Sequence, residues 1–198
     1  MFVLKPRAVG SNPTLSANPI KGGFVKTISA YKLFETRMKY PGQLFPLFID
    51  TQTAVRQGGV WVPAQFFPTK GYAERPGWHA GLLPMAPHLR CRDGFMAQSR
   101  VWAKVSLPAG VDWQPIADRS ATKDLRGIIP KNGYYRFKTS KMQGGVWLIG
   151  GALRIEQVLS DTEVATILEA ADEYEAALRE QHYNFTHRIY CNGDYSPC

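Results

Sequence analysis

Short runs of alternating apolar and polar residues, separated by Gly and Pro, constrain this chain more than any other feature. In residues 100–107, RVWAKVSL, the alternation puts Val101, Ala103 and Val105 on one side of an extended strand and the residues between them on the other. Strands with one apolar side pair into an antiparallel sheet whose apolar face is covered. The sequence therefore predicts a sheet, with further strands expected at residues 30–36, 43–50, 58–67, 134–140 and 144–159.

Gly and Pro residues set the expected boundaries and irregularities of these strands. Pro41-Gly42 predicts the turn of a β-hairpin between the first two strands. Pro46 indicates that the second strand lies at an edge or carries a bulge, because proline has no N–H to donate to a neighbour. Gly150-Gly151 interrupts the last strand and predicts a bulge or a close approach of the backbone.

A helix is expected after the last strand. Ser160 followed by Glu163 forms the pattern of a capping box, in which each side chain satisfies a backbone N–H of the other residue at a helix start. The helix is expected over residues 161–181, with an apolar stripe and acidic residues on the remaining surface. Strands followed by a terminal helix favour an α+β fold, with a mostly antiparallel sheet and a C-terminal amphipathic acidic helix. The stripe consists of Val164, Leu168, Ala171 and Leu178.

Residues 1–28 differ from the rest of the chain because they have no hydrophobic period. Within them GSNP, residues 10–13, can be encoded by GGT TCG AAT CC, the T-loop sequence of bacterial tRNA genes. We interpret the segment as the translated end of a tRNA gene, where prophages and other elements integrate, and Val25 fits a GTG start codon. The expected organisation is an unstructured leader at 1–28, a single α+β domain at 29–182 and a tail at 183–198.

Charge is distributed unevenly along the 198 residues. Residues 31–155 hold 18 Lys and Arg against 7 Asp and Glu, a net charge of +11, whereas residues 156–198 have a net charge of −7. A basic body indicates a polyanionic partner, with the acidic helix turned elsewhere or folded against the body. No apolar run reaches the ~18 residues that a membrane helix needs, and the three scattered cysteines form no disulfide framework. We therefore expect a cytoplasmic protein with no membrane partner.

One candidate site lies in a stretch, residues 71–89, that is stiffened by three prolines. Arg75, Trp78, His79 and His88 combine a guanidinium, an indole and two imidazoles, which suits a nucleotide or another ligand with an aromatic ring and an anionic group. The alternative is a structural role, in which Trp78 fills the core and His79 donates to a backbone carbonyl.

A second candidate site follows in residues 130–145, where cations alternate with aromatic residues. On a strand, Tyr135 and Phe137 share the core face, and the opposite face forms a basic edge that can meet phosphates. The alternative is an ordinary solvated strand face. The candidate contacts are Lys131, Tyr134, Arg136, Lys138 and Lys141, joined by Arg75 from the first stretch and by Arg90 directly after it.

Catalytic and metal-binding signatures do not stand out. The chain has no P-loop, no G-x-G-x-x-G, no G-x-S-x-G and no H-E-x-x-H. His182, His187, Cys191 and Cys198 are residue types that bind zinc, but their spacing fits no zinc module. We expect no metal and no cofactor, and we favour a protein that is not an enzyme.

Several blocks of the sequence together resemble a family of uncharacterised proteins and domains from phages and mobile elements of gut bacteria. The most specific blocks are RPGWH at 75–79 and WLIGGALRI at 147–155, and RVWAKV and GYYRFKT also fit. The resemblance covers about residues 31–170. It implies a mobile-element context and a compact α+β domain, without an established activity.

A second resemblance is to ADP-ribosyltransferases, whose early layout has an opening strand, a GWH-type turn and a V-W-x-K-V strand. It implies NAD as the cofactor. The opening strand, Tyr31–Glu35, lacks the His or Arg that grips NAD in that family. His79 would substitute for that residue, and Glu156 would serve as the catalytic acid.

The leading functional expectation is an accessory protein of a prophage or similar element that binds DNA, RNA or a host nucleoprotein, for instance an anti-CRISPR protein. In a second version of this expectation, the acidic helix mimics nucleic acid toward a basic protein. One alternative is the NAD- or nucleotide-using transferase. Another is a structural or interaction protein of a phage particle, which would bind through the apolar edge at residues 44–48.

Overall fold

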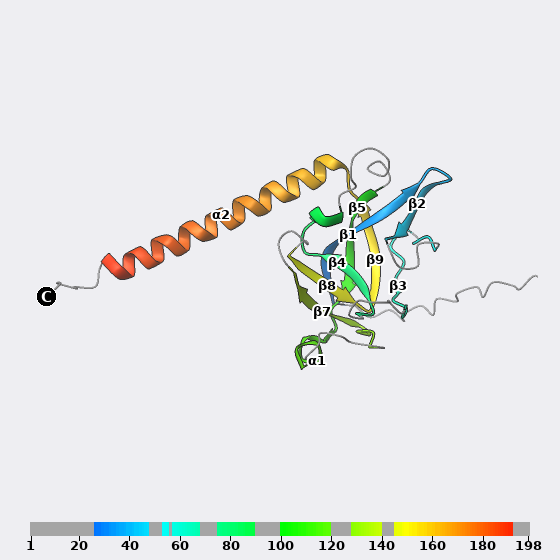
Figure 1. Ribbon diagram of the computed structural model, residues 1–198, viewed down its shortest axis with the longest axis horizontal. Helices are drawn as coiled ribbons and strands as arrows, with labels where there is room; N and C mark the ends of the chain where they lie inside the picture. The colour runs from blue at the N-terminus through cyan, green and yellow to red at the C-terminus, as the bar shows by residue number, and fades with distance from the viewer. Residues whose placement is uncertain are drawn as a thin grey trace, which may run out of the picture.

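The computed structural model of the protein describes residues 26–47, 53–55, 57–67, 75–89, 100–119, 128–139 and 145–191. These residues form a nine-stranded sheet, a short 3₁₀ helix and two α-helices (Figure 1). The expected α+β class is confirmed. The strands are β1 (Thr27–Arg37), β2 (Tyr40–Pro46), β3 (Val62–Pro63), β4 (Trp78–Gly81), β5 (Arg100–Pro108), β6 (Val111–Asp112), β7 (Gly133–Lys138), β8 (Val146–Gly150) and β9 (Ala152–Val158). The helices are η1 (Pro87–Leu89), α1 (Gln114–Arg119) and α2 (Asp161–Cys191).

The strand β1 lies in the middle of the sheet. The strand order is β3-β9-β5-β1-β4-β8-β7-β6, and β2 also pairs with β1. All pairs are antiparallel except β6 and β7, which run parallel. Most neighbours are distant in the sequence, so the sheet joins segments from the whole described chain.

Both faces of the sheet carry apolar clusters, because consecutive residues of a strand point to opposite faces. On one face, Ala30, Phe34 and Val105 are fully buried in the main core. On the opposite face, Tyr135 and Ile149 pack with α1, which lies at the end of the sheet formed by β7 (Figure 1). The second cluster places α1 next to β7.

The expected hairpin of the first two strands is present, but its turn lies at Met38-Lys39 and not at Pro41-Gly42. Pro41 and Gly42 lie inside β2, and Gly42 has a φ of 75°. The register of the pair shifts between Glu35 and Arg37. A glycine with positive φ serves an irregular strand as well as a turn, which is why the Pro-Gly signal was misleading.

Residues 144–159 do not form the single interrupted strand that was expected. β8 pairs with β4 and β7, whereas β9 pairs with β3 and β5. Gly151 links them, and a Cβ there would lie 2.1 Å from the carbonyl oxygen of Pro130. The expected close backbone approach is confirmed. The continuity of the strand is wrong, because apolar alternation looks the same on both sides of a glycine link.

The helix α2 begins where the capping box predicts. The Ser160 hydroxyl accepts the N–H of Glu163 at 3.3 Å, and the Glu163 carboxylate accepts the N–H of Ser160 at 2.7 Å. The helix runs past the expected end at residue 181 to Cys191. It leaves the sheet after β9 and projects away from it (Figure 1). Within the described ranges, no helix combines the length and apolar character that a membrane span requires.

Further elements lie where irregular chain was expected. β4 and η1 fall in the Pro- and Gly-rich stretch, and β6 and α1 fall in residues 108–132. Four strand residues and six helical residues are too few for a hydrophobic period to show, so local patterns miss them. β1 begins at Thr27, just inside the expected leader, and the tRNA-like residues lie outside the described ones.

Candidate functional site

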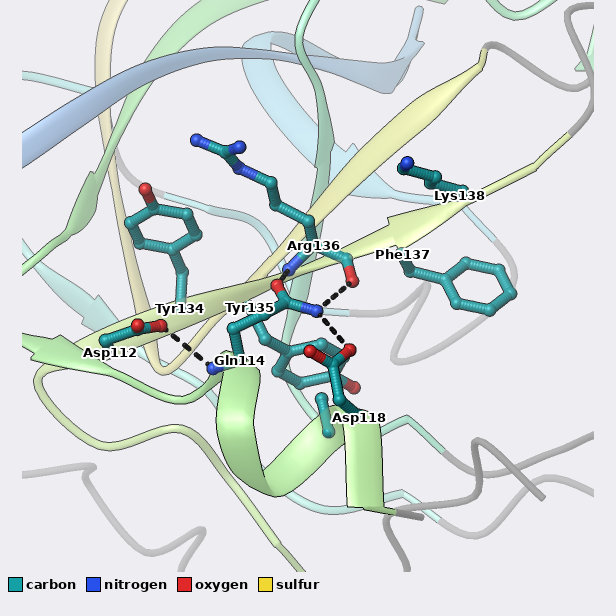
Figure 2. A pocket seen from close by; sticks show the side chains of 9 residues that line it. Asp112, Gln114, Asp118, Tyr134, Tyr135, Arg136, Phe137 and Lys138 are labelled. Carbon is teal, nitrogen blue, oxygen red and sulfur yellow. Dashed lines mark hydrogen bonds between the residues drawn. The ribbon is translucent and has the colours of Figure 1, made fainter. Parts of the chain in front are cut away.

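The strand β7 separates its side chains as the sequence predicts. Figure 2 shows Tyr134, Arg136 and Lys138 on one side of the strand and Tyr135 on the other. Arg136 and Lys138 are exposed, Tyr134 is half-buried, and Tyr135 is buried. The side chains of β7 therefore alternate as expected, but both sides border apolar clusters: Tyr134 packs against the main core, and Tyr135 belongs to the second cluster.

A hollow of about 640 Å³ lies along the margin of the sheet between β7 and α1. Its lining combines aromatic rings, two cations and two carboxylates, a mixture typical of sites that bind both a ring and charged groups. The lining residues are Asp112, Gln114, Ala117, Asp118, Tyr134, Tyr135, Arg136, Phe137 and Lys138.

The helix α1 is fixed to the outer edge of β7 by Gln114. The side-chain oxygen of Gln114 accepts the N–H of Arg136 at 2.8 Å, and its amide nitrogen donates to the carbonyl of Arg136 at 3.3 Å. The same amide donates to Asp118 at 2.8 Å, and Asp112 accepts the backbone N–H of Gln114 at 2.9 Å (Figure 2). Gln114 thus hydrogen-bonds β7 as a neighbouring peptide group would, and it fixes the floor of the hollow.

The two candidate stretches of the sequence meet on the α1 side of β7. The guanidinium carbon of Arg75 lies 3.8 Å from the centre of the Phe137 ring, which is a close cation–π contact. Tyr135, two residues before Phe137, lies on the same face of the strand, and only 3% of its surface is exposed. Sequence spacing gave no sign of this contact, because 62 positions separate Arg75 from Phe137.

Two polar atoms of this cluster are buried without a hydrogen-bond partner: the Nε of Arg75 and the hydroxyl of Tyr135. Burial raises the pKa of Tyr135, although the nearby charge of Arg75 acts in the opposite direction. The phenol therefore stays protonated at neutral pH.

His79 has the structural role that was given as the alternative. Its Nε2 donates to the carbonyl of Arg75 at 2.9 Å. The pKa of His79 is lowered to about 4, mainly by burial; the hydrogen bond to Arg75 acts to raise the pKa, and the charges of Lys32 and Arg75 act to lower it. The ring is neutral at physiological pH and is engaged with the backbone.

Trp78 also has a packing role. Its indole N–H donates to the carbonyl of Val62 at 2.9 Å, and its ring packs against the main core. The structural alternative for this residue therefore agrees with the geometry.

Lys32 is a polar residue near the site that sequence reasoning missed. Its Nζ donates to the carbonyl of His79 at 3.0 Å and lies 5.4 Å from the centre of the Trp78 ring. Burial lowers the pKa of Lys32 to about 8. One feature of the sequence could have revealed it. Lys32 lies midway between Ala30 and Phe34, which are both buried on one face of β1, so the alternation of side chains places Lys32 on that face too.

The remaining candidates lie elsewhere or outside the description. Lys131 is exposed in the turn before β7, and its carbonyl accepts the indole N–H of Trp113 at 3.2 Å. His88 belongs to η1, but its side chain is outside the described set. Arg90 and Lys141 also lie outside the described residues.

The structure does not bring together the pair that the ADP-ribosyltransferase resemblance implies. His79 lies on β4 and Glu156 on β9, with β1 and β5 between them. Glu156 accepts the hydroxyl of Ser106 at 2.5 Å and the Nε of Arg154 at 2.8 Å. Burial acts to raise the pKa of Glu156, but these hydrogen bonds outweigh it and lower the pKa. No substrate position next to both residues follows from this placement.

No match was found when the chain was compared with protein-family models, with curated proteins and with solved structures. Among the described residues, no three His, Cys, Asp or Glu side chains gather as metal ligands would. The geometry of the hollow and of the adjoining cluster is thus the basis for a functional argument.

Proposed function

We propose that the protein binds nucleic acid through the exposed side of β7. One observation carries the proposal: Arg136 and Lys138 point to the same side of one strand, and neither pairs with a carboxylate of the described residues (Figure 2). Cations that are not already neutralised can take up phosphates, and the half-buried ring of Tyr134 beside them can stack on a base. The net charge of +11 over residues 31–155 attracts such a polyanion over a longer range.

We further propose a biological setting for this binding. The tRNA-like leader and the resemblance to proteins of phages and mobile elements support an accessory protein of a prophage or similar element. Such a protein acts in the bacterial cytoplasm on host DNA, RNA or a nucleoprotein, for instance as an antagonist of host defence. Its binding requires no metal or cofactor.

The test is fluorescence anisotropy with a short labelled DNA duplex and with its single strand, titrated across salt concentration. The wild-type protein is compared with R136E/K138E. We expect wild-type affinity to fall steeply with salt, and the double variant to bind much more weakly. Removing two phosphate contacts lowers the slope of log K against log salt by about 2 for a duplex.

The matched control is K39E/K104E, which makes the same change in net charge on exposed residues of the β1–β2 turn and of β5. We expect this variant to keep the steep salt dependence of the wild type. Equal losses in both double variants would mean that charge alone, rather than β7, determines binding. Unchanged binding in R136E/K138E would reject β7 as the interface and favour a basic protein partner for the acidic helix.

A further inference from the structure

The cluster of half-buried Arg75, buried Tyr135 and half-buried Phe137 holds two buried polar atoms that can each donate a hydrogen bond. Arg75 is always charged. Its Nε and the hydroxyl of Tyr135 are both buried without a hydrogen-bond partner among the described residues. Buried donors in native proteins are nearly always satisfied, since an unmatched one costs about 1–3 kcal/mol. Oxygen atoms from outside the chain could accept from these donors.

The two donors are held in place by the fold and not by each other. Phe137 stacks under the guanidinium, and His79 binds the carbonyl of Arg75, so both ends of that residue are fixed. Tyr135 packs in one apolar cluster with Ile149 of β8 and Ala117 of α1. A ligand therefore meets donors that are already oriented, which reduces the entropy lost on binding.

We propose that Arg75 and Tyr135 bind a phosphate monoester, either on a free nucleotide or at the end of a nucleic-acid strand. This inference rests on the proposed function of β7 and names the group that the adjoining cluster recognises. A guanidinium and a phenol both donate to anionic oxygen, and a phosphate offers several oxygens to two donors. Tyr135 and Phe137 also line the 640 Å³ hollow, so a phosphate at the cluster lies beside a space of nucleotide size.

The charged residues that line the hollow favour one orientation of the bound ligand. Asp112 and Asp118 lie on the α1 side and repel a phosphate there, while their oxygens can accept the amino groups of a base. Arg136 and Lys138 lie across β7 and can hold the next phosphate of a strand. The terminal phosphate is therefore expected at Arg75 and Tyr135, with the base toward α1.

The experiment uses the full chain and four probes: a nucleoside monophosphate, the matching nucleoside, and one short DNA strand with either a 5′-phosphate or a 5′-hydroxyl. Calorimetry measures the nucleotides, and anisotropy measures the strands. We expect each phosphorylated probe to bind about tenfold more tightly than its partner, the usual effect of a charged hydrogen-bond pair. A preference confined to the free nucleotide identifies a nucleotide site, and one confined to the strand identifies an end-binding site.

The decisive variant is Y135F, which removes only the hydroxyl. Because that hydroxyl has no partner among the described residues, Y135F should unfold at the same urea concentration as the wild type or a higher one. It should lose most of the preference for the phosphorylated probe, while the matched control Y40F, at an exposed tyrosine of β2, keeps it. Equal binding of phosphorylated and unphosphorylated probes by the wild type, or an unchanged preference in Y135F, would overturn the inference. Salt-dependent binding of the 5′-hydroxyl strand is measured in the same series and tests β7 independently.

Discussion

At the scale of single residues, Lys32, His79 and Arg75 form a chain of polar contacts that joins β1 to the segment before β4. Lys32 donates to the carbonyl of His79, and the ring of His79 donates to the carbonyl of Arg75. Each donor satisfies a backbone carbonyl, as polar groups in a protein interior require. The chain explains how the Pro-Gly-rich residues 75–79 hold Arg75 against Phe137 without an ion pair to any carboxylate of the described residues.

The neutral ring of His79 makes stability depend on pH. Its pKa is about 4 in the folded protein against the usual 6.5, so between these values the unfolded chain binds a proton that the folded protein does not. The free energy of unfolding therefore falls as the pH drops from 6.5 to 4, by at most about 3 kcal/mol. Urea unfolding at about pH 7 and about pH 4.5 measures this loss.

The variant H79Q provides the comparison, because glutamine can still donate to the carbonyl of Arg75 but does not titrate. We expect H79Q to be less stable than the wild type at pH 7, since the ring also packs. Its further loss on acidification should be clearly smaller. If wild type and variant lose the same amount, the responsible proton binds elsewhere.

At the scale of elements, α2 depends on its first turn more than most helices, because it projects from the sheet and gains little from packing (Figure 1). S160A removes the hydroxyl that accepts the N–H of Glu163. We expect the helix to lose about 1 kcal/mol of stability and the circular dichroism signal at 222 nm to weaken on mild heating. The control T162A also removes a hydroxyl, but from the second residue of the helix. We expect T162A to leave the signal at 222 nm unchanged. An equal loss of signal in T162A would contradict the capping argument.

Prediction from sequence succeeded for elements whose signal is local. The alternation of residues 100–107 matches β5, and Ser160 with Glu163 marks the start of α2, because both signals need only neighbouring residues. The alternation of side chains along β7 followed from the same rule. These local patterns also sufficed for the fold class.

The rest of the site depends on which strands become neighbours. In the sequence, Gly151 indicates an interruption within one strand. Only the pairing of β8 with β4 and of β9 with β5 shows that this glycine separates two strands. The contact of Arg75 with Phe137 requires β4, β8 and β7 to lie in that order. A single sequence carries no signal for such an order, so Arg75 was expected beside Arg136 and Lys138, whereas it lies against Phe137 on the opposite side of β7.

At the scale of the whole molecule, the acidic residues of α2 are set apart from the basic body. Asp172 and Glu173 lie roughly 18 Å along the helix from Ser160, at 1.5 Å per residue. Charges that far away are screened at physiological salt, where the Debye length is about 8 Å, but not at 0.01 M, where it is about 30 Å. The acidic residues of α2 and the basic body therefore interact electrostatically only at low ionic strength.

The variant D172N/E173Q tests this separation in the DNA-binding assay. We expect affinity to stay within about twofold of the wild type at 0.15 M salt and to increase at 0.01 M salt, because only there does the helix repel the polyanion. A clear increase at 0.15 M salt would show instead that α2 folds back over the β7 surface in solution.

The interleaved strand order also determines how this chain acquires its fold. Ala30 pairs with Val105, and Trp78 pairs with Gly150, so these partners are more than 70 residues apart in the chain. Closing such long loops costs entropy before any pairing repays it, which makes folding slow compared with a sheet of consecutive hairpins. During synthesis, β1 exposes an unpaired edge until β5 has left the ribosome, and β5 does so until β9 follows. The nascent protein is therefore exposed to aggregation for most of its translation, and its soluble yield should rise when synthesis is slowed by cooling.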